Sequence, residues 1–156
     1  MRLPVKLTTK VLLFNFFLCW AAALTLEAAE KSFQSVQITI KTISASKKGS
    51  EFDAQLAPLE KQLKALNYRS YRLLKEETKT APWQGNANFE IPGGRLLTVK
   101  PQEVTNNQLG LRVQLKKSDK PQLDTTVRLS NGGNFILGGP PHEDGVLVLS
   151  ITASAR

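Results

Sequence analysis

The 156-residue chain carries 21 lysine and arginine residues against 13 aspartate and glutamate residues, a formal net charge of +8, and it contains a single cysteine, Cys19. One cysteine excludes an intrachain disulfide, so a folded domain depends on its apolar core for stability. The positive charge favours contact with anionic lipid headgroups, polysaccharide or acidic proteins, or it serves only to keep the surface soluble.

The N-terminus has the pattern of an export signal. Basic residues precede Val11–Leu24, which is apolar apart from one asparagine. A membrane-spanning helix needs roughly 20 apolar residues, so this shorter run predicts a signal peptide rather than an anchor. Small residues predict cleavage between Ala23 and Ala29, which assigns residues 1–29 to the signal peptide and residues 30–156 to a single β-rich domain.

Export has consequences for the rest of the chain. Removal of the leader leaves a mature protein without any thiol, which excludes thiolate catalysis and cysteine metal ligands. A periplasmic or secreted location makes nucleic acid an unsuitable partner, and contact with the membrane is expected only through the signal peptide. A protein or another envelope component is the partner that the sequence predicts, and its oligomeric state stays open.

The first half of the domain is predicted to contain a strand and then a helix. Ser35–Ser46 alternates apolar and polar residues, the pattern of a half-buried strand. Leucines then recur at helical spacing within residues 54–66, which predicts an amphipathic helix. Proline breaks a helix interior but is tolerated in the first turn, so Pro58 predicts that the regular part begins near Ala57 and ends around Asn67.

The second half is predicted to consist of short strands separated by glycine-rich or proline-rich turns. The segment 68–80 is expected to be a strand with a charged tail, and "PGG" at 92–94 to close a hairpin. "NGG" at 131–133 is among the strongest hairpin signals in the chain. Further strands are expected at residues 88–91, 96–100, 109–116, 123–130, 135–137 and 146–153, the last as a central strand.

Together these elements predict an α+β fold that is mostly antiparallel β. It has about eight short strands, in a sandwich or an open sheet, and one helix near residues 54–66. A parallel βαβ arrangement is excluded because the sequence lacks the crossover helices.

Four segments carry a resemblance to known proteins: "LNYRSYRLL", "FEIPGGRLLTVKP", "LDTTVRL" and "FILGGPPHEDGVLVLSI". They resemble a group of small exported β-rich bacterial proteins of uncharacterised function, over residues 36–153. The glycine pair after a short apolar strand is also similar to the closing segment of secretin-type envelope proteins. The resemblance implies an exported β-rich fold and no particular activity.

The segment "GGPPHEDG", residues 138–145, holds the chain's single histidine and is the candidate chemical site. We expect it to form a long, stiff hairpin loop, because its glycines allow turns and its prolines restrict the backbone. His142, Glu143 and Asp144 are the candidate catalytic residues. Adjacent residues cannot easily turn onto one ion, and no second histidine is present, so neither a metal site nor a cofactor is predicted.

Basic residues on predicted strands form the second candidate site. If those strands are neighbours, their polar sides would merge into a binding face with Tyr68, Tyr71 and Trp83 as aromatic anchors. The alternative is a soluble face with the aromatics in the core. The residues in question are Arg69, Arg72, Arg112 and Lys116, with Lys75 and Lys117 beside them.

The sequence favours a non-enzymatic, exported domain that binds another component of the bacterial envelope through a sheet face or a sheet edge. Two alternatives stay open. One is a hydrolase or metal-dependent enzyme that uses His142 with Glu143 or Asp144, and the other is an inhibitor that presents the 138–145 loop to a target.

Overall fold

A computed structural model describes residues 34–156 of the chain. The predicted signal peptide lies outside the described residues. No helix in the described part is both long enough and apolar enough to cross a bilayer. The strands are β1 (Ser35–Ser46), β2 (Ser70–Pro82), β3 (Ala87–Ile91), β4 (Arg95–Thr105), β5 (Gln108–Lys117), β6 (Lys120–Ser130), β7 (Asn134–His142) and β8 (Gly145–Ala155).

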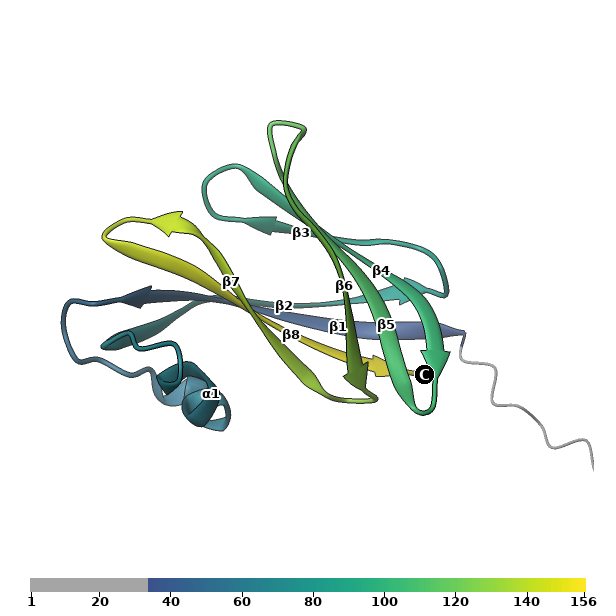
Figure 1. The fold of residues 1–156 in the computed structure, drawn as a ribbon, viewed down its shortest axis with the longest axis horizontal. Helices are drawn as coiled ribbons and strands as arrows, with labels where there is room; N and C mark the ends of the chain where they lie inside the picture. Colours follow the sequence, from purple (N-terminus) through teal and green to yellow (C-terminus); the bar gives the residue numbers. More distant parts are fainter. Residues whose placement is uncertain (1–33) are drawn as a thin grey trace, which may run out of the picture. The chain divides into compact units, whose positions relative to one another are not determined.

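The strands form two four-stranded antiparallel sheets that pack face to face (Figure 1). Sheet A has the order β2-β1-β8-β7, and sheet B has the order β3-β4-β5-β6. The predicted class, mostly antiparallel β with one short helical segment, is confirmed. β8 occupies the central position that its continuous apolar sequence indicated.

The main core lies between the sheets and follows from the period-2 pattern of the strands. Alternate residues of β1, β5 and β8 point into this core and are almost fully buried. Most of their neighbours in β1 and β5 are polar and more exposed, whereas in the central strand β8 Val148 and Ser150 are also buried, on the other face of sheet A. The central members of the core are Ile38, Ile40, Leu97, Val99, Leu109, Leu111, Val113, Leu149 and Ile151.

A second core covers part of the outer face of sheet A. Its helical segment, η1 (Ala54–Leu59) followed by α1 (Glu60–Lys64), packs on the side of sheet A that faces away from sheet B (Figure 1). The hydroxyl of Tyr71 donates a hydrogen bond to the carbonyl of Leu63 and accepts one from the backbone N–H of Tyr68. Tyr71 therefore belongs to the core and is no exposed anchor.

The helical segment is less regular than its leucine spacing predicts. The predicted helix is present, but its first half is a 3₁₀ helix that contains Pro58, and only Glu60–Lys64 is α-helical. The Asp53 side chain accepts a hydrogen bond from the backbone N–H of Gln55 at 3.0 Å and caps the start of the segment. Proline has no N–H to donate to an α-helical ladder, which accounts for the tighter turn at this end.

The prediction of a hairpin at "NGG" is wrong. β6 belongs to sheet B and β7 to sheet A, so residues 131–133 carry the chain from one sheet to the other. The backbone N–H of Gly132 donates to the carbonyl of Ala153 at 2.8 Å, and the N–H of Ala153 donates to Gly133 at 3.3 Å. These hydrogen bonds to β8 direct β7 into sheet A. The turn preference of the "NGG" sequence therefore does not produce a hairpin, because pairing with a strand distant in the chain decides the path.

Candidate functional site

The segment "GGPPHEDG" forms a much tighter turn than expected. β7 extends to His142 and β8 begins at Gly145, and these two residues pair with each other. The turn itself consists of Glu143 and Asp144, and Glu143 has a φ of 50°. The prediction of a long loop over residues 138–145 is therefore wrong, although a hairpin does join the two strands.

Two local features explain why the strands continue so far. The residues from Gly138 to Pro141 form an irregularity in the β7–β8 pairing, which places both prolines in an edge strand where an N–H is dispensable. At Gly145 an added Cβ would come within 1.9 Å of the carbonyl oxygen of Ala45. Only glycine permits β8 to begin so close to β1, which keeps the turn short.

The three candidate catalytic residues point to different partners. The Nε2 of His142 lies 3.8 Å from a carboxylate oxygen of Glu143. The other oxygen of Glu143 lies 3.8 Å from Arg72, and Asp144 pairs with Lys48 at 3.2 Å. Within residues 34–156 no group of three histidine, cysteine or acidic side chains is placed to hold a metal ion.

A cavity of about 310 Å³ lies beside this turn. Serines of β1 and β2 line it together with Arg72, Glu143 and Asp144, so the structure brings one candidate arginine next to two of the candidate acids. The Lys48 ammonium donates to Asp144 and lowers the pKa of that carboxyl from its usual value. These ion pairs connect the β7–β8 turn to the end of the β1–β2 pair, so their charges neutralise one another.

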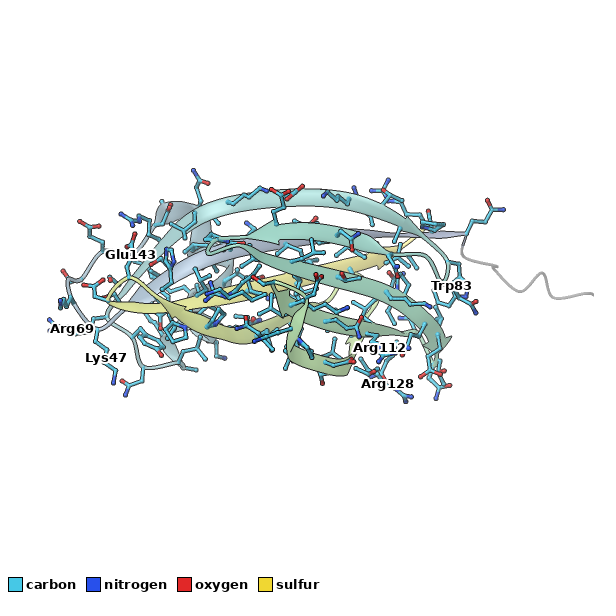
Figure 2. All side chains as sticks on the ribbon, turned by 90° about the horizontal axis from the view of Figure 1, so that it is seen from above. Lys47, Arg69, Trp83, Arg112, Arg128 and Glu143 are labelled. Atoms are coloured by element: carbon cyan, nitrogen blue, oxygen red, sulfur yellow. The ribbon has the colours of Figure 1, made fainter. Side chains whose placement is uncertain are left out.

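The candidate basic residues do not form one face. Arg72 lies on β2 of sheet A and Arg69 directly precedes that strand, whereas Arg112 and Lys116 lie on β5 of sheet B. Figure 2 shows Arg69 near one end of the domain and Arg112 towards the other. Since β2 and β5 are not neighbours, the condition for a merged face is not met.

Arg112 forms an ion pair with Asp124 of the neighbouring strand β6. Its guanidinium donates two hydrogen bonds to Asp124, at 2.9 and 2.7 Å, and Gln114 donates a third to the same carboxylate at 2.8 Å. These donors lower the pKa of Asp124 to about 2, and the carboxylate in turn raises the pKa of Arg112. A bidentate arginine–carboxylate pair of this kind fixes the geometry of both side chains on the outer face of sheet B.

Lys116 lies elsewhere, beside an open hollow of about 600 Å³ between the β3–β4 and β5–β6 turns. Lys75 and Arg95 line the same hollow, as do the acids Glu90 and Asp119. The exposed Leu96 contributes an apolar side chain. Because acids and bases alternate around the hollow, its charge does not favour one sign of ligand.

The sheet edges differ from one another, which the sequence did not predict. The sheet order leaves β2 and β7 at the edges of sheet A, and β3 and β6 at the edges of sheet B. An unpaired edge exposes backbone N–H and C=O groups to any further strand, and proteins block such edges with prolines, bulges, short strands or inward-pointing charges.

Edge strand β2 is blocked by charges that face inward. Glu77 and Lys79 pair with Ile40 and Ile38, so they point to the face that carries the main core. The Glu77 carboxylate contacts Lys79 at 2.9 Å and Lys75 at 2.7 Å, and these donors lower its pKa. The ammonium of Lys79 also lies 5.1 Å from the ring centroid of Phe89. A strand added here would bury these charges.

Two further edges have other protections. β7 carries Gly138, Gly139, Pro140 and Pro141 together with its pairing irregularity. β3 has only five residues, Ala87–Ile91, which offers a very short template.

Edge strand β6 has Pro121 and a pairing irregularity at Gln122 at its start, but none of these devices from Leu123 to Ser130. Its inner face presents Thr125, Val127 and Leu129, and its charged residues Asp124 and Arg128 are both on the outer face. In the described part of the chain, residues 120–129 make backbone ladder bonds only with β5. β6 and β7 diverge from the turn that joins them, residues 131–133 (Figure 1). The free edge of β6, defined as residues 123–130, is therefore a site that the sequence did not predict.

One signal of this edge was present in the sequence. The alternation over residues 123–130 correctly placed the charges on one face. The predicted "NGG" hairpin, however, would have put β7 beside β6 and covered the edge. Only the crossing of the chain to sheet A leaves it free.

Comparison of the chain with protein-family models, with curated proteins and with solved structures found no match.

Proposed function

We propose that this protein is an exported, non-enzymatic binding or assembly module of the bacterial cell envelope, and that it acts through the free edge of β6. The observation that supports the proposal is the contrast between edges: the other long edges carry inward charges or prolines along their length, whereas β6 has one proline at its start, Pro121, and neither device from Leu123 to Ser130. The basic N-terminal residues and the apolar run Val11–Leu24 support export.

Strand addition gives such a module a mechanism that requires no catalytic residue. The unpaired backbone groups of β6 supply hydrogen bonds to an extended segment, and the alternating side chains select which segment fits. Leu123 and Thr125 are half-buried at the edge and face the core side, so they would meet apolar or small side chains of the added strand. On the other face, Asp124 and Arg128 would meet polar side chains.

The test compares a blocked edge with a matched control. Thr125→Lys places an inward-pointing ammonium on β6, as Lys79 does on β2, and leaves every observed ion pair in place. Thr78→Lys adds the same charge to the exposed outer side of the β2 edge. Full-length wild-type and variant chains are immobilised and exposed to detergent extracts of bacterial envelopes, and self-association is measured in parallel.

We expect the wild type and Thr78→Lys to retain the same partner, or to self-associate equally. Thr125→Lys should weaken either interaction at least about tenfold, a change of about 1.4 kcal/mol. Equal behaviour of all three proteins, or no interaction of the wild type in either assay, would refute the proposal.

The same assays address the sites predicted from the sequence. His142→Ala should bind as the wild type does, because His142 lies at the far end of β7 from the turn that follows β6. If His142→Ala instead abolishes the interaction, the alternatives based on the 138–145 segment take precedence. Loss of binding in Arg72→Glu or Arg112→Glu, with Thr125→Lys unaffected, would move the contact from the edge to a sheet face.

A further inference from the structure

We infer that the strand received by the free edge of β6 is β6 of a second copy of this chain, paired antiparallel about Thr126. This inference rests on the proposed function, since it names the partner of the same edge. Its basis is that residues 123–129 are complementary to themselves when the strand is turned end for end.

Continuity of the sheet limits the possible registers. In an antiparallel pair, residues that oppose each other lie on the same face of the sheet. The inner residues of one copy must therefore oppose inner residues of the other, and a slip by one position would turn the core side of one copy to solvent. A two-fold axis must then pass through a residue of β6, from Asp124 to Arg128.

Charge selects one of these registers. With the axis at Asp124 or at Arg128, a like charge opposes its own copy, which is destabilising. With the axis at Thr126, each Asp124 opposes the Arg128 of the other copy. An axis at either remaining position leaves both charges opposite uncharged residues.

The same register also matches the inner face. Leu123 then opposes Leu129 of the other copy, and Thr125 opposes Val127. Leu123 and Thr125 are the half-buried inner residues of the edge, and pairing covers both of them. Cross-strand apolar and β-branched pairs of this kind stabilise a sheet.

The outer charges of β6 can join the dimer without giving up their present partners. Asp124 already binds Arg112, and Arg128 donates to Glu103 on β4. Pairing about Thr126 therefore produces a chain of alternating charges, from Glu103 through Arg128 to Asp124 and Arg112 of the other copy. Figure 2 shows Arg112 and Arg128 in the same region of the domain.

Symmetry limits the assembly to two copies. A two-fold axis uses the same surface on both partners and consumes the edge of each. The inward charges of β2 and the prolines of β7 then protect the remaining long edges of both copies. The expected product is a closed dimer in which the two copies of sheet B form one continuous sheet.

Cross-linking at the axis tests the register. Thr126→Cys is introduced into the full-length chain together with Cys19→Ser, and the protein is treated with a short bis-maleimide. Residue 126 opposes itself only in the inferred register, so a covalent dimer should form rapidly. Thr78→Cys in the same background is the control, because Thr78 is also an exposed threonine of an edge strand. No covalent dimer, or equal yields from the two cysteines, would overturn the inference.

A second pair of variants separates this inference from the proposed function. Thr126→Lys places two ammonium groups opposite each other at the axis and should weaken dimerisation at least about tenfold in sedimentation measurements. It leaves the edge open to a different strand, whereas Thr125→Lys blocks every strand. If the wild type is monomeric but captures an envelope protein that only Thr125→Lys loses, self-pairing is refuted and the proposed function stands. If Thr125→Lys alters neither assay, both are refuted.

Discussion

The edges formed by β2 and β6 have similar lengths and both carry acidic and basic residues, yet only the charges of β2 protect the edge. β2 carries Glu77 and Lys79 on the face of the main core, whereas β6 carries Asp124 and Arg128 on the opposite, outer face. Charges on the outer face still allow a further strand to pair, while inward charges would have to be buried. The face on which a charge lies, rather than the number of charges, decides whether an edge is open.

The protected edge depends on an apolar support. Lys79 lies over the ring of Phe89, and its ammonium donates to the backbone carbonyl of Asn88. Phe89 is 1% exposed and belongs to the main core. The inward ammonium thus remains at the rim of the sandwich, with its stem against an aromatic ring.

The largest expected effect follows from removing that support. Phe89→Ala should lower the free energy of unfolding by about 3–5 kcal/mol, because it leaves a cavity in the core beneath Lys79. Urea denaturation of the full-length chain measures the loss. Phe135→Ala removes an aromatic ring that is only partly buried against the same core and should cost clearly less. Equal losses in the two variants would contradict this account.

The next effect is on association. The double variant Glu77→Thr, Lys79→Thr replaces the inward charges of β2 with β-branched residues and should open this edge. Since β6 stays open, each copy then has two edge strands that can pair with another copy. Assemblies larger than a dimer should therefore appear in sedimentation measurements. Glu76→Thr is the control, because Glu76 lies on the outer face beside Lys41. Its assembly state should match the wild type, and larger assemblies from Glu76→Thr would contradict the role assigned to the inward charges.

A smaller effect on the free energy of unfolding is expected when an inward-pointing lysine, like Lys79 of β2, is introduced into β6. Thr125→Lys should change the free energy of unfolding of the monomer by less than about 1 kcal/mol, because the lysine stem can cover the rim while its ammonium reaches water. Val127→Lys, at a neighbouring inner position that is 8% exposed, should cost several times more. Thermal unfolding at low protein concentration measures both. A large loss from Thr125→Lys would show that its inner position is not at the rim.

The smallest effect concerns the ion pair on the open edge. The folded pKa of Asp124 is about 2, below its ordinary value of 3.8, so its contribution to stability is fully present above about pH 4 and is lost as the pH falls through about 2. The stability difference between wild type and Asp124→Asn should shrink over that interval. Asp119→Asn, in the adjoining turn, removes an acid that makes no ion pair among residues 34–156 and serves as the control. A difference for Asp124→Asn that is independent of pH would refute this assignment.

Much of the fold followed from local pattern. Alternation predicted the strands around Ser35–Ser46 and residues 109–130, because a strand buried on one face alternates apolar and polar residues in its sequence. The helical segment was located by its leucines, but its 3₁₀ half was not predicted, since Pro58 was expected in the first turn of an α-helix. The prediction at "NGG" failed because a bond from Gly132 to Ala153 links positions far apart in the chain.

The candidate sites were harder to predict for the same reason. The sequence placed His142, Glu143 and Asp144 together, but their partners Lys48 and Arg72 come from distant strands. The candidate basic face required strands to be neighbours, and strand order is not encoded in alternation. An open edge is a property of the strand order itself, so it emerged only with the topology.

The central place of β8 sets an order of events during synthesis. Sheet B consists of consecutive strands, residues 87–130, which can pair as soon as they have been made. Sheet A cannot close before β8, because this last strand lies between β1 and β7. β1 can pair with β2 early, but its other side has no partner before β8 is made, and until then the apolar face of sheet B has no completed layer to cover it. The domain acquires its native interior only after β8 has been made.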